Sequence, residues 1–346
     1  MSEYLKENNV YRLPAEWETQ EAVWFAWTTR DDLWPGYLEE VQNRFIELYK
    51  LCSDFQKVNI LCPENEQANL IRLLNSQNQK NEIIVHTYET DDVWIRDYGP
   101  IFLKHKNKGK LISTDWLFNA WGNKFDLFKK DNGVPKWLCS QLNIKNISFP
   151  KILEGGAIET NGEGMLCTTK NVLKNPNRNQ GNRSIDWDTC LYQSLGIEST
   201  LWFENGLYND DTDGHIDNVL RFAPGHQIVY ASESNEKSPN FLPLRQIEAQ
   251  LDTYSTGLLK GYKYHALPLP DPVYVEGLMM SASYVNYLVL NGAVLVPCFD
   301  QAKDKEALSV IQNCFPNREV IDFNCLEIIR EGGGLHCLSL NQPLAN

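Results

Sequence analysis

One pattern of apolar and polar positions recurs along the chain: a helix-like stretch leads through a short loop into a β-branched apolar run. It appears in residues 37–63, 135–150, 243–270 and 304–323. Apolar residues at i, i+3 and i+4 predict the helices, and short runs such as "VNIL" and "EVIDF" predict the strands. Four such units indicate an α/β protein made of similar modules, although their sequences share little identity.

Further strands are expected between these units. "QIVYA" (227–231) has a strand pattern, and "YLVLNGAVLVPCF" (287–299) predicts a hairpin with Asn-Gly at its turn. No low-complexity linker divides the chain. We therefore expect a single α/β domain that spans residues 1–346.

The composition is compatible with a large core. The chain has 346 residues, of which 42% are apolar, including 10 Trp, 15 Tyr and 14 Phe. No window approaches the roughly 18 apolar residues of a membrane span. The N-terminal "MSEYLKENNVYRLP" lacks the apolar segment of a signal peptide. These features predict a cytoplasmic protein.

The charge balance is strongly acidic, with a net charge of −13 and no long basic cluster. This disfavours nucleic acid and anionic membranes as partners. An excess of acid attracts small cations, although it also serves solubility alone.

Nine cysteines are scattered singly along the chain. Their odd number, the lack of a CxxC pair and the lack of an export signal argue against a disulfide framework or a zinc ribbon. Eight of them fit small buried apolar positions. Cys337, in "EGGGLHCLSL" (331–340), differs because a glycine-rich loop can present a thiol at a close-packed position.

Two further stretches place an acid beside a turn. In "DDVWIRDYGP" (91–100), Asp97 lies among aromatic residues before Gly-Pro, as a site residue or as a plain Asx turn. In "LEGGAIETNGEGMLCTT" (153–169), Glu154 precedes two glycines, where the backbone can approach a ligand closely. The alternative for Glu154 is a charged residue that flanks a strand.

The stretch "NDDTDGHIDNVLRF" (209–222) places four aspartates and a histidine within eight residues. If "HIDNVLRF" begins a strand, His215 and Asp217 point to the same face. A calcium loop would need an acid at its twelfth position, where Leu220 stands. A solvated acidic turn remains the other alternative.

A reactive Cys337 needs a neighbouring group, since a free thiol ionises only near pH ~8.5. His336 would point away from Cys337 in a strand, so His215 is the better candidate. Surplus carboxylates do not suit peptide hydrolysis, because they raise the pKa of a thiol and repel an oxyanion. They do suit a guanidinium, which carboxylates bind in bidentate fashion and whose charge stabilises a thiolate.

These motifs, together with "LPAEWETQEAVWFAW", "FNAWGNKF", "EGGAIETNGEGMLCTTKNVLKNPNRN", "SYVNYLVLNGAVLVP" and "GGGLHC", resemble the agmatine deiminase and bacterial-type peptidylarginine deiminase family. The resemblance runs from about residue 11 to 342, with the motifs in the family order. It implies a five-bladed α/β propeller (pentein) with pseudo-fivefold symmetry and an active site in the central channel.

The resemblance also implies roles for the matching residues. Cys337 matches the nucleophile, and His215 matches the general acid and base. Asp97 and Asp217 match the carboxylates that hold the guanidinium. Glu154 is expected to line the same pocket. No metal or organic cofactor is implied.

Two further residues are expected at the tail of the substrate. Trp94 resembles an apolar wall for the alkyl stem, and Asp211 falls where agmatine deiminases usually have Glu and is expected to contact a distal amine. The chain departs from common family motifs at "RDYGP", "DTDGH" and "GGGLHC", that is at Tyr98, Asp211, Asp213 and Gly334. All these departures are expected to lie around the substrate tail.

The sequence therefore predicts a hydrolase that converts agmatine to N-carbamoylputrescine and ammonia through a covalent intermediate on Cys337. A protein or peptidylarginine deiminase that forms citrulline is the alternative, and it should show an Arg that clamps a substrate carboxylate. A non-catalytic amine-binding member is the third hypothesis. A homodimer is compatible with the family.

Overall fold

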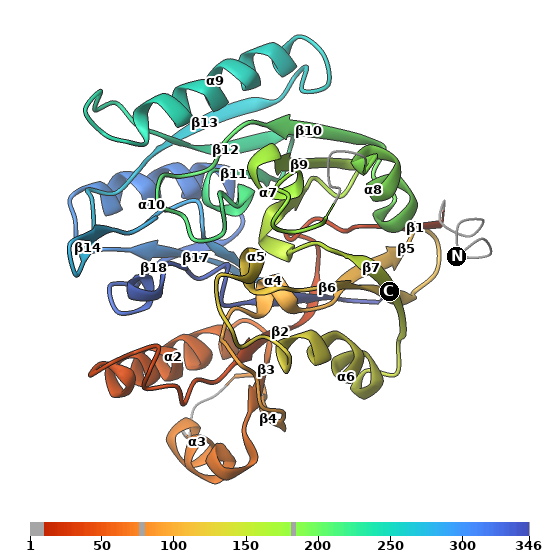
Figure 1. Ribbon diagram of the computed structural model, residues 1–346, viewed down its shortest axis with the longest axis vertical. Helices are drawn as coiled ribbons and strands as arrows, with labels where there is room; N and C mark the ends of the chain where they lie inside the picture. Colours follow the sequence, from red (N-terminus) through yellow and green to blue (C-terminus); the bar gives the residue numbers. More distant parts are fainter. Residues whose placement is uncertain (1–9, 76–79, 181–184, 346) are drawn as a thin grey trace.

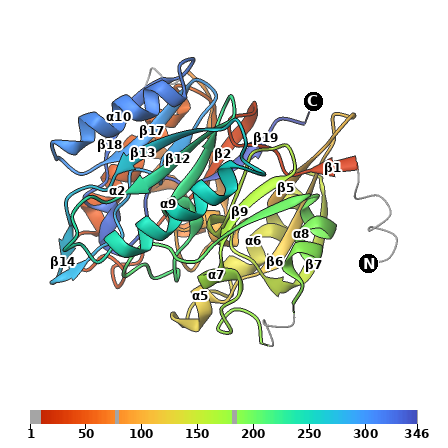
Figure 2. The ribbon, with the colours of Figure 1, turned by 90° about the horizontal axis from the view of Figure 1, so that it is seen from above.

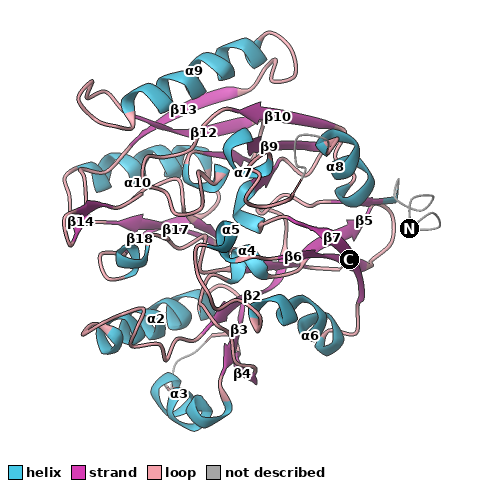
Figure 3. Cartoon of the chain, in the orientation of Figure 1, coloured by secondary structure: helices cyan, strands magenta, loops and turns pink. Residues whose placement is uncertain are grey.

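The computed structural model describes residues 10–75, 80–180 and 185–345 (Figure 1). Within these residues one arrangement occurs five times: two antiparallel strands, a helix, and a third strand parallel to the second. Parallel neighbours need a crossover connection, and the helix supplies it in each unit. The long crossover helices lie toward the outside of the molecule, with short helices near its middle (Figure 3). The predicted α/β class is confirmed.

Four of the units follow one another along the chain. Their elements are β5 (Ile101–His105), β6 (Leu111–Leu117), α6 (Val134–Gln141) and β7 (Lys145–Ile152); β8 (Ile158–Thr160), β9 (Met165–Thr169), α8 (Trp187–Leu195) and β10 (Ser199–Phe203); β11 (Leu220–Ala223), β12 (Gln227–Ser232), α9 (Phe241–Ser255) and β13 (Lys263–Pro268); and β16 (Leu288–Val289), β17 (Ala293–Cys298), α10 (Lys303–Cys314) and β18 (Glu319–Asn324).

The fifth unit joins the two ends of the chain. β19 (Leu340–Pro343) pairs antiparallel with β2 (Gln20–Ala26), as Figure 2 shows, and α2 (Leu38–Ser53) leads from β2 to the parallel strand β3 (Lys57–Cys62). The turn that carries Cys337 is thereby anchored directly before a strand of this sheet.

The remaining elements are short. They are β1 (Tyr11–Arg12), α3 (Gln67–Leu74), β4 (Ile83–Thr87), α4 (Ile95–Tyr98), α5 (Ala120–Asn123), α7 (Lys170–Leu173), β14 (Tyr274–Val275) and β15 (Leu278–Met279), with 3₁₀ turns at Glu64–Glu66, Asp131–Gly133, Gly155–Ala157, Ile216–Asn218 and Ile328–Glu331. No helix among the described residues is long and apolar enough to cross a membrane.

The four predicted helix-to-strand units and the Asn-Gly hairpin are confirmed. The unit of α8 and β10 was not predicted. Its helix does carry local signals at both ends. Asp186 accepts a hydrogen bond from the backbone N–H of Thr189 at 3.1 Å, and Gly196 has φ +72°.

Two expected strands near the site are turns instead. The chain from Ile216 to Asn218 forms a 3₁₀ turn, closed by the N–H of Val219 on the carbonyl oxygen of Ile216 at 2.9 Å, and the strand begins only at Leu220. Cys337 also lies in a turn. Strand alternation therefore does not explain how these side chains are oriented, and tertiary contacts do.

Candidate active site

A cavity of about 120 Å³ lies beside the turn that carries Cys337. Its described walls combine aromatic rings with an excess of acid and contain no Lys or Arg. The carboxylates are Asp92, Asp97, Asp210, Asp211 and Glu331, and the aromatic rings are Trp94, Trp121 and Phe125. A larger hollow of about 570 Å³ near Tyr262 has no thiol among its described walls. The smaller cavity therefore combines a nucleophile with a potential that favours a cation.

Cys337 is almost fully buried at the wall of this cavity. Asn286 holds its turn: Oδ1 accepts from the backbone N–H groups of His336 and Cys337 at 3.0 and 3.3 Å, and Nδ2 donates to the sulfur at 3.1 Å. Burial, then the charges of Asp217 and Asp97, raise the pKa of the thiol well above its ordinary range. Without a cation beside it, the sulfur is therefore a neutral thiol.

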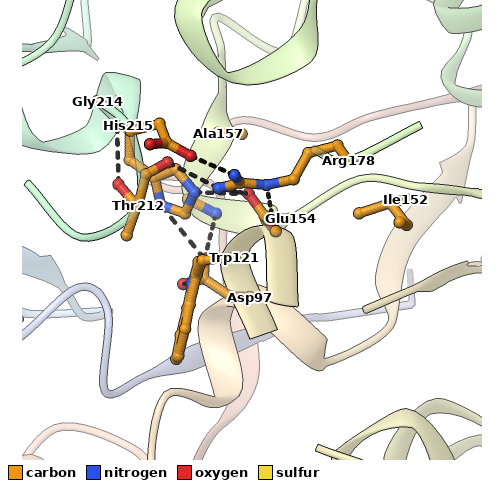
Figure 4. Close-up of polar contacts among 12 residues, drawn as sticks. Asp97, Trp121, Ile152, Glu154, Ala157, Arg178, Thr212, Gly214 and His215 are labelled. Carbon is orange, nitrogen blue, oxygen red and sulfur yellow. Dashed lines mark hydrogen bonds and ion pairs between the residues drawn. The ribbon is translucent and has the colours of Figure 1, made fainter. Parts of the chain in front are cut away.

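His215 is fully buried among three carboxylates. Its Nε2 lies 2.9 Å from Glu154 Oε2, and its Nδ1 lies 3.6 Å from Asp97 Oδ1 (Figure 4). Burial lowers the pKa of the imidazole, but the charges of Asp97, Glu154 and Asp217 outweigh this and raise it to about 9. His215 is therefore an imidazolium at neutral pH and can protonate a leaving group.

Glu154 is held by Arg178 on the side away from Asp97 (Figure 4). Arg178 donates from Nε to Glu154 Oε1 at 2.6 Å and from Nη2 to Oε2 at 3.2 Å. Burial raises the pKa of Glu154, but Arg178 and His215 together lower it below its ordinary range. Arg178 also donates to Asp213 and, at 2.7 Å, to the carbonyl oxygen of Thr212. It thereby ties Glu154 to the loop that precedes His215.

Asp97 is oriented by two donors. Its Oδ1 accepts from the backbone N–H of Gly156 at 2.9 Å, and its Oδ2 accepts from Trp121 Nε1 at 2.9 Å. Burial raises the pKa of Asp97 to about 6, although the charge of His215 opposes this rise. Asp97 is therefore mostly ionised at neutral pH, but it is easier to protonate than an exposed Asp.

Asp217 contacts Cys337 and His336. Its Oδ2 lies 2.7 Å from His336 Nδ1 and 3.6 Å from Cys337 Sγ. Burial raises the pKa of Asp217, but the hydrogen bond and the charge of His336 outweigh this and lower it. Asp217 Oδ1 and His215 Nδ1 are buried and have no hydrogen-bond partner among the described residues. They offer an acceptor and a donor to a ligand.

The side chains of His215, Asp97 and Asp217 all lie close to the backbone of Gly156. A Cβ atom there would lie 2.6 Å from His215 Nδ1, 2.7 Å from Asp97 Oδ1 and 3.0 Å from Asp217 Oδ2. Only a residue without a side chain leaves room for this arrangement. The sequence predicted that the backbone after Glu154 lies close to other groups of the site. The lack of a side chain at Gly156 makes this possible.

A left-handed turn positions Trp121. Ala120, Trp121, Gly122 and Asn123 have φ values of 49°, 52°, 94° and 61°. This conformation costs roughly 1–2 kcal/mol for each residue that is not glycine. Backbone strain of this kind gathers at functional sites. Here it places an indole in the cavity wall with its N–H on Asp97.

A family model described as Porphyromonas-type peptidyl-arginine deiminase matches residues 12–343. The chain belongs to this family. The agmatine deiminase of Pseudomonas aeruginosa (strain LESB58) is 33% identical over 360 residues, which cover 96% of this chain and 95% of that protein. The predicted family is confirmed.

Solved structures give the same result. A Cys-to-Ser variant of the C. Jejuni agmatine deiminase with substrate bound is 31% identical, with a TM-score of 0.87 and 96% of each chain covered. The agmatine deiminase of Enterococcus faecalis is 27% identical, with a TM-score of 0.91 and coverage of 99% of this chain and 98% of that chain. An amidinotransferase from Microseira wollei shares the fold, at 13% identity and a TM-score of 0.51.

Within this family frame, the structure brings most of the predicted site residues to one place. Cys337, Asp97, Trp94 and Asp211 line the cavity. His215 and Asp217 contact Asp97 and Cys337 from the interior. Glu154 is not among the described wall residues; it contacts the ring of His215 instead.

Two family departures do not lie at the cavity, contrary to expectation. Tyr98 is buried, and its hydroxyl donates to the carbonyl oxygen of Asp92 at 2.8 Å. Gly334 packs on Asn286, where a Cβ would lie 2.6 Å from Oδ1. Gly333, by contrast, lies flat against the ring of Trp94. Tyr98 and Gly334 therefore support wall residues and the nucleophile turn rather than the substrate tail.

Asp213 also does not lie at the cavity, although it was expected around the substrate tail. It pairs with Arg178, and its Oδ1 lies 2.8 Å from Lys124 Nζ. These cations lower the pKa of Asp213 although burial opposes them. Asp213 is thus occupied by the protein, whereas Asp211 lines the cavity.

Sequence reasoning missed several residues that hold the site together. They are Arg178, Asn286, Trp121 and Glu331, while His336 was considered only as a base for Cys337 and set aside. Most lie inside motifs that carry the family resemblance, such as "NPNRN", "FNAWGNKF" and "SYVNYL". Their presence was visible, but their partners lie far away in the sequence and could not be inferred from spacing.

Proposed function

We propose that the protein is an agmatine deiminase, a hydrolase that converts agmatine to N-carbamoylputrescine and ammonia on a route to putrescine. The observation that carries this proposal is the cavity, which combines a buried thiol with five carboxylates and has no Lys or Arg among its described walls. Agmatine has a guanidinium at one end and an ammonium at the other. Both ends suit an acidic site.

We assign the guanidinium to Asp97 and Asp217. A guanidinium is planar and presents N–H donors in a fork that matches carboxylate oxygens. Asp217 Oδ1 is an acceptor without a partner among the described residues, and Asp97 lines the cavity. Held by both acids, the guanidinium carbon would face Cys337, which is the orientation that attack requires.

The substrate itself activates Cys337. Burial and the nearby carboxylates keep the sulfur protonated when no cation lies beside it. A bound guanidinium offsets these negative charges, so the pKa of the thiol falls and its proton leaves to solvent. The N–H of Asn286, 3.1 Å from the sulfur, then stabilises the thiolate.

The reaction proceeds in two halves. The thiolate of Cys337 forms a bond to the guanidinium carbon, His215 protonates a nitrogen, and the C–N bond breaks to release ammonia. An amidino-thioether intermediate remains on the sulfur. Neutral His215 then takes a proton from water, whose oxygen attacks the same carbon. The C–S bond breaks, the proton of the new C–OH group passes to solvent, and the ureido product leaves as the thiolate is restored.

We assign the distal amine to Asp211, with Asp92 and Glu331 close by. Burial raises the pKa of Asp211, and it raises the pKa of Asp92 and of Glu331 to about 7 each. An ammonium beside these acids would stabilise their ionised forms. A peptidyl-arginine would instead place its own carboxylate or amide groups against them, which favours agmatine.

The wider architecture completes the proposal. We assign the five units to a five-bladed α/β propeller (pentein) with pseudo-fivefold symmetry and the cavity to its central channel. Recurrence of the same strand and helix order supports this assignment. Residues 1–346 would form one deiminase domain, since the larger of two apolar clusters among the described residues runs from Val23 to Leu340. A cytoplasmic location suits nine free cysteines, and the family suggests a homodimer.

The proposed function is tested by comparing substrates. Ammonia and ureido product are measured with agmatine, free arginine and a peptide that ends in arginine. We expect kcat/KM for agmatine to exceed the other values at least about 100-fold, because only agmatine brings an amine to the acids. Turnover of the peptide but not of agmatine would identify a peptidylarginine deiminase. Binding without turnover of any substrate would indicate an amine-binding member.

Asp211→Asn is expected to raise KM for agmatine about tenfold through loss of a charged partner for the amine. Butylguanidine, which lacks the amine, is the matched control substrate. Its KM should be unchanged by the substitution. An equal rise for both compounds would place Asp211 outside the amine subsite.

A further inference from the structure

His336 is enclosed by charged groups behind Cys337, with its side chain 1% exposed. Its Nδ1 lies 2.7 Å from Asp217 Oδ2, and its Nε2 lies 2.7 Å from Glu16 Oε1. A neutral imidazole has one N–H, so its second nitrogen would turn a lone pair toward a carboxylate oxygen. Both contacts are attractive only when one more proton is present, either on the second ring nitrogen or on one of the two acids.

The two acids do not hold this proton. Glu16 Oε1 lies 2.8 Å from Arg96 Nη1, and Glu16 Oε2 pairs with Arg221. Burial raises the pKa of Glu16, but Arg96, His336 and Arg221 outweigh it and lower the pKa far below its ordinary range. The pKa of Asp217 is also lowered. With an arginine on each oxygen of Glu16, the geometry places the additional proton on the imidazole.

The charges around His336 are consistent with a cation at this place. Arg96 donates from Nε to the carbonyl oxygen of His336 at 3.2 Å. Arg221 donates from Nε to Glu159 Oε2 at 2.7 Å, and burial raises the pKa of Glu159 to about 7. On the other side of Asp217 stand the thiol, His215 and Asp97, as described above. The acids on this side are therefore Glu16, Glu159 and Asp217. The groups that can balance their charge are Arg96, Arg221 and the imidazole.

We propose that His336 is a positioning residue, held between Asp217 and Glu16, that binds one oxygen of Asp217 and leaves the other, Oδ1, for the guanidinium. The proposal rests on the proposed deiminase function. His336 itself does not touch the substrate. Because it precedes Cys337 directly, one turn carries both the nucleophile and the cation that orients the carboxylate beside it. Glu16 holds the imidazolium from the far side.

Removal of this cation changes how Asp217 titrates. The charge and hydrogen bond of His336 lower the pKa of Asp217, so the pKa rises when they are lost. Asp217 must be ionised to bind a guanidinium, so activity is present above this pKa and is lost as the pH falls through it. Asp97 must also be ionised and, with a pKa of about 6, sets the acidic limb of kcat/KM in the wild-type protein. Without His336 the pKa of Asp217 rises toward that of Asp97, so the acidic limb becomes steeper or moves to higher pH.

The test compares His336→Gln, Glu16→Gln and the control His86→Gln. In the wild-type protein, His86 is not among the cavity residues, and its Nε2 lies 2.9 Å from Asn59 Oδ1. In His336→Gln we expect KM for agmatine to rise at least about tenfold and the acidic limb to become steeper or to move to higher pH. Glu16→Gln should change KM and the limb less, in the same direction. His86→Gln should match the wild-type protein.

A second readout does not depend on turnover. Nitrogen-15 NMR of labelled histidine in the wild-type chain should show both ring nitrogens of His336 protonated at pH 7. The signals of His336 are identified by their absence from the His336→Gln spectrum. If that variant does not fold, they are identified by their change in chemical shift in Glu16→Gln. A neutral ring at pH 7, or an unchanged KM together with an acidic limb of unchanged position and steepness in the folded variants, would overturn the proposal. Wild-type inactivity toward agmatine would instead overturn the proposed function.

Discussion

Replacement of Cys337 by serine is expected to abolish turnover of agmatine. We expect kcat to fall at least about 1,000-fold, because a serine hydroxyl needs a base to become a nucleophile. His215, with its pKa raised to about 9 by the surrounding acids, already holds its proton at neutral pH and cannot serve as that base. A bound guanidinium can ionise a thiol but not a hydroxyl, whose pKa lies far higher. Ammonia release measures the effect.

The fold of Cys337→Ser should remain intact, since a hydroxyl can keep the contact with Asn286. Its thermal midpoint is expected within a few degrees of the wild-type value, roughly the effect of 1 kcal/mol or less. Cys139→Ser is the matched control, because Cys139 is buried beside Ser113 Oγ, at 2.9 Å, outside the cavity. Activity of Cys337→Ser above a few per cent of the wild-type value would show that the nucleophile is wrongly assigned.

His215→Gln is expected to show the second largest loss. General acid and base catalysis contributes about 10²–10⁴-fold, and His215 acts in both halves of the reaction. We therefore expect kcat to fall about 1,000-fold or more. The variant should bind agmatine, because Asp97 and Asp217 remain. Steady-state kinetics and a binding measurement separate the two effects.

The pH profile gives the same assignment an independent check. The acids around His215 raise its pKa to about 9, so the acid form is present below this pH and is lost above it. Wild-type turnover should decline above about pH 9, and this alkaline limb should be absent in His215→Gln. His265→Gln is the control, because the wild-type ring of His265 contacts Gln227 at 2.9 Å. This variant should keep the wild-type kcat and the alkaline limb. A variant at position 215 with more than a tenth of wild-type kcat would contradict the role of His215.

Local patterns predicted the parts of the fold that local interactions stabilise. The crossover helices α2, α9 and α10 carry apolar residues at helical spacing, and strands follow them as expected. The unit of α8 and β10 has a weaker pattern and escaped prediction. The turns at Ile216–Asn218 and at Cys337 could not be read from alternation, because their conformation follows from buried polar contacts.

The candidate site divides in the same way. The chemistry of a thiol, an imidazole and acids around a cation could be inferred from residue types, and so could the family. The sequence does not reveal that Asp213 is neutralised by Arg178 while Asp211, two residues earlier, lines the cavity. It also does not reveal that Glu16, over 300 residues away, contacts His336. Such partners are set by how the units pack together.

Mass analysis of the wild-type protein, quenched with acid during steady turnover of agmatine, tests the central claim most directly. The claim is that agmatine carbon becomes bonded to Cys337. We predict that the peptide containing Cys337 carries an added amidino group derived from agmatine, and that peptides with the other cysteines carry none. Turnover of agmatine without any adduct on Cys337, or with an adduct on another residue, would contradict the account.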